Sequence, residues 1–276
     1  MKGNTDAQCS DSTRQTNMFY IDDENVGHDD VFIKSMDCDC FYKARPSFYF
    51  GLNQELGGLH SNAKGCGLKQ IYDEEQKTWM IIRTRMEIDK IASWTDTLEL
   101  RTWCQENHRL YAPRAIEAYD KTTGERIFST LSWWVVMDLA KKRPCRPDIF
   151  TSRLPFADKE KYYKTPVLPP YPQKDEYTVE LDDMNVSINY YDTDYNRHVN
   201  NISYVNWMLD AFPKKFLDEY RPTLIDVKWE KQSFLDDRLI VKTYQKENTQ
   251  EFLTNILRDD ECVFTGLTSW AKKENE

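Results

Sequence analysis

Two segments of the chain show the apolar spacing of a helix, and the clearer one lies in the C-terminal half. Its apolar residues recur every three or four positions: Ile202, Val205, Leu209 and Phe212. This spacing places them on one helical face. Asn200 or Asn201 is suited to cap the N-terminus of the helix, and Pro213 is expected to end or kink it.

A second helix is predicted in the N-terminal half, over residues 46–56. It begins with Pro46, which the first turn of a helix tolerates, and it continues through an aromatic stretch. The glycines that follow, Gly57-Gly58 and Gly65-Cys66-Gly67, are weak as phosphate-binding signals and are expected to form loops.

Strand-like segments follow each helix. Residues 78–88 and 239–244 are rich in the β-branched and aromatic side chains that favour strands. Each half is therefore predicted to run from a helix into several long alternating strands.

The two halves also resemble each other in sequence. Residues 128–134 (FSTLSWW) align with residues 264–270 (FTGLTSW), and residues 93–103 align with residues 233–244. One long helix wrapped by an antiparallel sheet, made twice, is the hot-dog arrangement. The chain is therefore predicted to be an α+β protein with two tandem hot-dog repeats.

Composition divides the chain further. Residues 1–30 are rich in aspartate and are expected to form a flexible acidic segment. Seven of the eleven prolines lie between residues 144 and 172, which predicts a Pro-rich, basic connector over residues 141–174. The first repeat is then expected over residues 31–140 and the second over residues 175–276.

Charge and cysteine content exclude several classes of protein. The net charge of −9 disfavours non-specific nucleic-acid binding. The longest apolar runs are far shorter than the roughly 20 residues of a membrane span, and the N-terminus lacks the pattern of a signal or transit peptide. Seven cysteines, an odd number, argue against a disulfide framework, and none has zinc-site spacing. A cytoplasmic protein without a metal is expected.

Polar side chains alternate just ahead of the C-terminal helix, in the stretch YDTDYNRHVNNISYVNW (residues 191–207). Asp194, Asn196 and His198 stand at steps of two, so they can converge on one side of an extended segment that leads to a helix N-terminus. Taken alone, these residues also fit turn and capping chemistry, and Glu230 fits a solvated strand residue. At this level both interpretations remain open.

The combined pattern resembles the acyl-acyl carrier protein thioesterases. The most specific part of the likeness is Asp194-x-Asn196-x-His198-Val-Asn-Asn, with Glu230 on a later strand. The resemblance implies hydrolysis of fatty acyl-acyl carrier protein to free fatty acid and carrier protein, the step that ends fatty acid synthesis. It implies no cofactor.

The first half carries further parts of the resemblance. They are the strings Trp79-x-x-x-Arg83, Trp94-Thr-Asp96 and Trp134-Val-Val-Met-Asp138 followed by Arg143. The likeness covers residues 31–276.

The resemblance assigns catalysis to Asp194, Asn196, His198 and Glu230. Thioester hydrolysis needs an activated water, a site for the oxyanion and a proton for the leaving thiol. His198 is suited to proton transfer near neutral pH, and Glu230 is a candidate general base. Asp194 can orient the histidine or the water, and Asn196 can hold the carbonyl or the water. The oxyanion site is expected at the backbone N–H groups of the helix N-terminus, Val199, Asn200 and Asn201.

The chain departs from the family immediately after Glu230. Plant members carry a cysteine there, whereas this chain has Lys231. A thiol nucleophile at that place is therefore excluded, and Cys262, in a late predicted strand, has no motif around it. A cysteine-independent enzyme is expected.

The internal repeat suggests a division of labour. With Ser203-Tyr204 aligned to Ser47-Phe48, the polar triplet of the second repeat falls opposite Cys38, Cys40 and Tyr42. The second repeat is then expected to carry the chemistry, and the first to offer an apolar slot for the acyl chain.

The implied partner is an acyl carrier protein with a phosphopantetheine-linked acyl chain. Such carriers are acidic, as is this protein, so docking requires a local basic surface. The candidates lie in the connector: Lys141, Lys142, Arg143 and Arg146. Two alternatives remain open, an acyl-CoA thioesterase and a non-catalytic acyl-binding protein of the same fold. The sequence is compatible with a homodimer.

Overall fold

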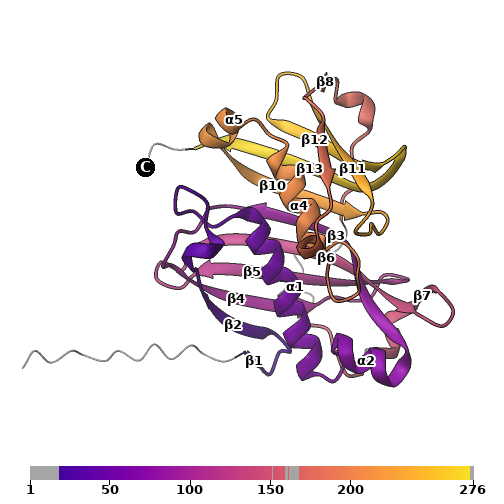
Figure 1. The fold of residues 1–276 in the computed structure, drawn as a ribbon. Helices are drawn as coiled ribbons and strands as arrows, with labels where there is room; N and C mark the ends of the chain where they lie inside the picture. The colour runs from indigo at the N-terminus through magenta and orange to yellow at the C-terminus, as the bar shows by residue number, and fades with distance from the viewer. Residues whose placement is uncertain (1–18, 151, 159–160, 162–167, 274–276) are drawn as a thin grey trace, which may run out of the picture.

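The computed structural model describes residues 19–150, 152–158, 161 and 168–273. Its two main helices, Pro46–Ala63 (α1) and Asn201–Asp210 (α4), lie against an extended antiparallel sheet, one helix over each half (Figure 1). Among the residues that the structure describes, none of the helices is both long enough and apolar enough to cross a membrane.

The first repeat wraps α1 with antiparallel strands. In chain order the elements are Tyr20–Ile21 (β1), Gly27–Phe32 (β2), Leu68–Glu75 (α2), Lys77–Ile88 (β3), Thr97–Cys104 (β4), Tyr111–Asp120 (β5), Arg126–Asp138 (β6) and Arg143–Cys145 (β7). The strand predicted over residues 78–88 is confirmed as β3. Tyr49 of α1 is fully buried against Phe128 of β6, with ring centroids 4.7 Å apart.

Helix α1 is longer than the sequence predicts. Gly57 and Gly58 continue the helix instead of forming a loop, and the first left-handed glycine is Gly65, beyond the helix end. A Cβ atom at Gly57 would lie 3.2 Å from Cδ of Arg114 on β5. The glycine therefore eases the close approach between helix and strand, a use that the loop prediction overlooked.

The second repeat has the same plan in a shorter form. Its further elements are Val179–Glu180 (β8), Met184–Ser187 (β9), Lys214–Glu219 (α5), Tyr220–Trp229 (β10), Arg238–Gln245 (β11), Glu251–Arg258 (β12) and Glu261–Lys272 (β13). The predicted cap is confirmed, because the Asn200 side chain accepts a hydrogen bond from the N–H of Ile202 at 2.9 Å. Pro213 separates α4 from α5. Tyr204 packs on Phe264 as Tyr49 packs on Phe128.

Both repeats share one sheet. Within the described residues its order is β1-β2-β4-β5-β6-β3-β10-β13-β12-β11-β8, with β7 on β6 and β9 on β11. Strands β3 and β10 pair where the repeats meet. There Arg83 donates two hydrogen bonds, of 2.9 and 2.8 Å, to the carboxylate of Asp226, which is 1% exposed. The α+β fold with two tandem hot-dog repeats is confirmed.

The sheet begins earlier in the chain than predicted. Strands β1 and β2 lie largely within residues 1–30, so the prediction of a flexible segment was wrong for residues 20–30, and residues 1–18 lie outside the described part. The acidic composition is misleading because an aspartate can stand in a paired strand: Asp30, whose side chain is 10% exposed, forms an ion pair with Lys121.

The predicted connector is partly ordered against the first repeat. Strand β7 pairs with β6, and Phe150 and Leu154 are buried in a cluster that includes Cys66 and Val136. Residues 151, 159–160 and 162–167 of the connector lie outside the described part.

Candidate active site

A tight turn presents the predicted polar triplet just ahead of α4. Oδ1 of Asp194 accepts hydrogen bonds from the backbone N–H groups of Asn196, at 2.8 Å, and His198, at 3.3 Å. The turn closes through Arg197, whose φ of 62° is left-handed, and through the bond from the N–H of Asp194 to the carbonyl of His198. Asp194 therefore holds the backbone that carries the other two side chains.

The first repeat contains the same turn. Oδ1 of Asp39 accepts from the N–H groups of Phe41, at 2.8 Å, and Lys43, at 3.0 Å, and Tyr42 has a φ of 62°. Asp39 is thus the equivalent of Asp194.

The alignment that placed Cys38, Cys40 and Tyr42 opposite the triplet was wrong by one residue. The correct counterparts of Asp194, Asn196 and His198 are Asp39, Phe41 and Lys43. The error arose because the alignment followed serine and aromatic residues in the helices, whereas turn geometry sets the register.

His198 is half-buried and lines a cavity between the two repeats. Its ring meets the ring of Phe234 edge-on, at 5.3 Å between centroids. Glu230 lines the same cavity from the end of β10, where its N–H donates to the carbonyl of Val263 at 2.9 Å. Its carboxylate pairs with Lys228 at 2.6 Å. Both residues line the cavity, and among the described residues no hydrogen bond joins His198 to Glu230.

The N-terminus of α4 offers fewer free N–H groups than the sequence suggests. The N–H of Val199 donates to the carbonyl of Ser233 at 2.9 Å, and that of Asn200 donates to the carbonyl of Asp192 at 2.7 Å. Within the described part of the chain, the N–H of Asn201 has no hydrogen-bond partner. Of the three expected oxyanion donors, only Asn201 is therefore available to a ligand.

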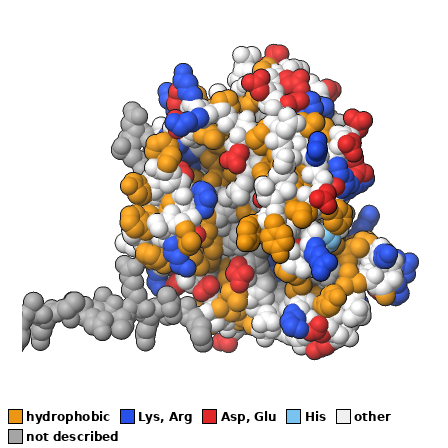
Figure 2. Space-filling view, in the orientation of Figure 1, with side chains coloured by type: hydrophobic (Ala, Val, Ile, Leu, Met, Phe, Trp, Pro, Cys, Tyr) orange, Lys and Arg blue, Asp and Glu red, His pale blue; other side chains and the backbone are white. Residues whose placement is uncertain are grey.

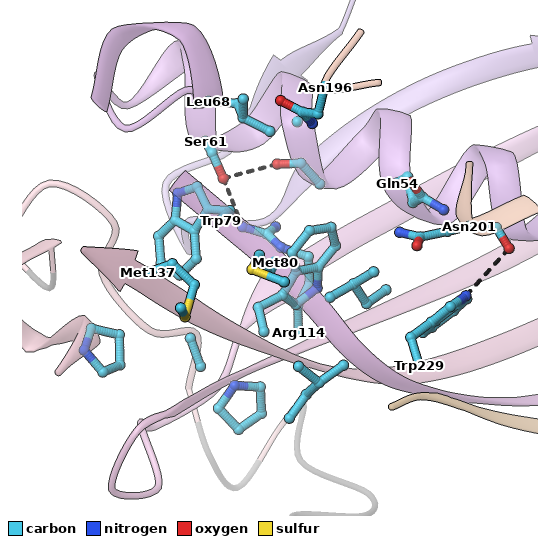
Figure 3. A pocket seen from close by; sticks show the side chains of 18 of the residues that line it. Gln54, Ser61, Leu68, Trp79, Met80, Arg114, Met137, Asn196, Asn201 and Trp229 are labelled. Atoms are coloured by element: carbon cyan, nitrogen blue, oxygen red, sulfur yellow. Dashed lines mark hydrogen bonds between the residues drawn. The ribbon is translucent and has the colours of Figure 1, made fainter. Parts of the chain in front are cut away.

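The cavity has a volume of about 840 Å³ and draws its walls from both repeats. Figure 3 shows Asn196, Asn201 and Trp229 of the second repeat around the same space as residues of the first. Those of the first repeat come from α1, α2 and the sheet: Gln54, Ser61, Leu68, Trp79, Met80, Arg114 and Met137. Sequence reasoning missed the polar members of this set, because residues such as Ser61 and Arg114 lie far apart in the chain and meet only in the fold.

The corresponding interior of the second repeat is filled by aromatic rings. Phe212, Phe216, Phe252 and Trp270 contact one another with centroid distances between 4.8 and 5.4 Å. We call these four residues the aromatic plug. The two repeats therefore differ inside as well as in their turns.

Two hot-dog repeats share one cavity, and a polar turn at a helix N-terminus lines it. These features define a double hot-dog protein of the thioesterase type. The chain belongs to the acyl-ACP thioesterase family. The family's N-terminal domain matches residues 29–150, and its C-terminal domain matches residues 175–272. Membership in this family makes the protein a thioester hydrolase.

Named relatives include two plant enzymes. The chain is 25% identical over 268 residues to the chloroplastic oleoyl-acyl carrier protein thioesterase of Coriandrum sativum, covering 82% of this chain and 71% of the relative. It is 26% identical to oleoyl-acyl carrier protein thioesterase 1 of Arabidopsis thaliana, covering 71% of this chain and 60% of that one. Since both relatives are chloroplastic, the cytoplasmic location expected from the sequence stays a prediction.

Solved structures share the fold. An acyl-ACP thioesterase from Bacteroides thetaiotaomicron superposes with a TM-score of 0.75 at 20% identity, covering 89% of this chain and 98% of that chain. The 12:0-ACP thioesterase from Umbellularia californica gives a TM-score of 0.73 at 18% identity, covering 90% and 94%.

Proposed function

We propose that the protein hydrolyses fatty acyl-acyl carrier protein to free fatty acid and carrier protein, ending fatty acid synthesis. Family membership supports the reaction. The observation that carries the proposal is the meeting of three features on one cavity: the Asp194 turn, the free N–H of Asn201 and the carboxylate of Glu230.

Water is the nucleophile in the proposed mechanism. Glu230, held by Lys228, takes a proton from a water as its oxygen attacks the thioester carbon. The oxyanion that forms is stabilised by the N–H of Asn201, at the positive end of the α4 dipole, and by the amide of Asn196. The carbon–sulfur bond then breaks, and His198 gives a proton to the departing thiolate.

No cysteine takes part in this mechanism. Lys231, which stands in the place of the plant cysteine, forms an ion pair with Glu261. Cys262 lies in β13, where its thiol approaches the carbonyl of Phe264 at 3.3 Å, and it is not among the cavity-lining residues.

A carrier protein would dock on the β6–β7 hairpin. Figure 2 shows Lys and Arg side chains gathered on a projection at the right edge of the molecule, where Figure 1 places β7. Lys142 and Arg143 are exposed there. Lys141 and Arg146 are exposed as well, but they pair with Asp138 and Asp148 at 3.3 and 2.9 Å. A projecting basic hairpin suits an acidic partner and would resolve the conflict between two acidic proteins.

The proposal is tested by the substrates of the purified full chain. Acyl-acyl carrier protein and acyl-CoA of matched chain length are compared by their kcat/KM values. A higher value for the carrier-protein substrate supports the proposal. A higher kcat/KM for acyl-CoA, which has the same pantetheine arm, would favour an acyl-CoA thioesterase. If the protein hydrolysed neither substrate, the enzymatic proposal would be refuted.

A further inference from the structure

The cavity contains a buried arginine without a negatively charged partner. Arg114 of β5 is 5% exposed and lines the cavity. Its guanidinium donates to Nδ1 of His60 at 2.9 Å, and to the hydroxyls of Thr102 and Ser61 at 3.2 Å each. Among the described residues, no carboxylate forms an ion pair with Arg114.

The groups around Arg114 are neutral. Burial, followed by the charge of Arg114, lowers the pKa of His60 to about 2, so this imidazole stays uncharged. Burial also raises the pKa of the Cys104 thiol, which is therefore not a thiolate. A buried cation without an anion is costly, and such groups normally find a partner.

The second repeat shows that the fold does not need this cation. Counted from the starts of α1 and α4, Phe212 and Phe216 stand at the positions of Gly57 and Ser61, although α4 ends at Asp210 and Phe216 lies in α5 whereas α1 continues to Ala63. The strand registers extend the match, since Cys104 pairs with Arg114 as Gln245 pairs with Phe252.

Arg114 with Gly57 and Ser61 thus occupies the place of the aromatic plug. The contacts are conserved in position: Arg114 touches α1 at both residues, as Phe252 touches Phe212 at 4.9 Å and Phe216 at 5.4 Å. The aromatic plug fills this place in the second repeat, whereas Arg114 and the cavity that it lines occupy it in the first. The second repeat fills the equivalent place without a charge, so this fold can be built without a buried arginine there.

Two further polar atoms of the cavity lining lack partners. Nε2 of Gln54 and Oε1 of Gln105 are buried without a hydrogen bond within the described residues. Buried polar atoms are nearly always paired, so these two point to polar groups on a bound molecule.

We propose that Arg114 binds an oxygen atom carried by the acyl chain, so that the preferred substrates are acyl thioesters with a hydroxyl, oxo or carboxylate group on the chain. A guanidinium only donates hydrogen bonds, which requires an acceptor on the ligand. The inference rests on the proposed function, because it concerns the acyl group of the same thioester substrate.

The experiment compares oxygenated and plain chains in the wild-type full-length enzyme. All substrates are acyl-carrier proteins of one chain length. The reference chain ends in a methyl group and carries no added oxygen. The test chains carry either a single hydroxyl or oxo group, placed at successive carbons, or a terminal carboxylate. We expect kcat/KM to rise about 10- to 100-fold for oxygen at one position, as for a hydrogen bond to a charged group. Equal or lower values at every position would overturn the inference. Hydrolysis of plain chains would still stand in that case, so the proposed function would survive.

Variants assign the preference to the guanidinium. Arg114→Met is expected to abolish the preference while it retains hydrolysis of the plain chain. Arg101→Met is the matched control, because Arg101 lies on neighbouring β4 with its guanidinium over Tyr119, outside the cavity lining. If Arg114→Met keeps the preference, Arg114 is not the receptor. If Arg114→Met fails to fold, Arg114→Lys is measured instead. The inference would also be contradicted if Arg114→Lys preferred oxygen at the same carbon and by the same factor in kcat/KM as the wild-type enzyme.

Discussion

Asp39 and Asp194 hold the same turn, one ahead of each main helix. Each carboxylate accepts two backbone N–H groups, and each turn closes through a left-handed residue, Tyr42 or Arg197. Only the second turn carries an amide and an imidazole at the following alternate positions. The aspartate is therefore part of the repeat's architecture, and the proposed catalytic side chains stand on a turn that both repeats contain.

This equivalence predicts how the two aspartates differ in their effects. Asp39→Ala and Asp194→Ala are each expected to lower the free energy of unfolding by about 1 to 2 kcal/mol, because each removes two hydrogen bonds to backbone. Only Asp194→Ala should also reduce kcat. Urea denaturation and steady-state kinetics of both variants check this, and equal loss of turnover in both would assign the effect to stability alone.

Proton transfer at the site predicts a large loss for two substitutions. His198→Ala and Glu230→Gln are each expected to lower kcat by about 10² to 10⁴-fold with the fold intact. Lys43→Ala, at the counterpart of His198 in the first repeat, is the matched control and should leave kcat unchanged. Near-normal turnover in a folded His198→Ala protein would remove His198 from the mechanism.

A water mechanism predicts that the thiol of Cys262 is dispensable. Cys262→Ser is expected to retain most of the wild-type kcat/KM, because the thiol faces the sheet backbone and not the cavity. Alkylation of the wild-type protein followed by mass mapping provides the second measurement. Complete inactivation by modification of Cys262 alone, with unchanged circular dichroism, would contradict the prediction.

The basic hairpin predicts an effect confined to the carrier-protein substrate. Reversing charge at Lys141, Lys142 and Arg143 together is expected to raise KM for acyl-carrier protein, whereas hydrolysis of a small acyl thioester should barely change. Added salt should weaken the wild-type reaction with the carrier protein through screening.

The control for this experiment is charge reversal at Lys214 and Lys215 of α5, which lie outside the hairpin. Equal loss on both substrates would show that the hairpin supports the fold. No loss on either substrate would place the docking surface elsewhere.

The buried ion pair between the repeats predicts a large stability effect. Asp226→Ala leaves Arg83 buried without its carboxylate and should lower the free energy of unfolding by about 3 to 5 kcal/mol. Asp218→Ala removes an exposed pair with Lys214 and should cost about 0.5 kcal/mol or less. Thermal and urea denaturation compare the two, and a similar small loss in both would mean that the buried pair contributes little.

The sequence predicted the elements with strong periodicity and clear caps. The start of α4 at Asn201 and the extent of β3 follow from apolar spacing and from an asparagine with an N-cap geometry. The repeat was visible because aromatic residues such as Phe128 and Phe264 occupy equivalent core positions in both halves.

Three of the errors have a similar physical cause, since each involves contacts with residues outside the local sequence pattern. Gly57 lies inside α1, where its lack of a side chain leaves room for Arg114, far along the chain. Strand β2 forms despite its aspartates because it pairs with β4. The N–H groups of Val199 and Asn200 are already used by carbonyls of Ser233 and Asp192, which no local pattern reveals.

The β3–β10 pairing has a genetic consequence. If the molecule were instead a dimer of two identical single-repeat subunits, one gene would encode both. Any substitution would then change the interior of both repeats at once. Here Arg114 and Phe252 have separate codons, although they occupy equivalent places in one continuous sheet. Natural selection can therefore reshape the interior that receives a ligand while the other interior keeps the aromatic packing that holds the molecule together.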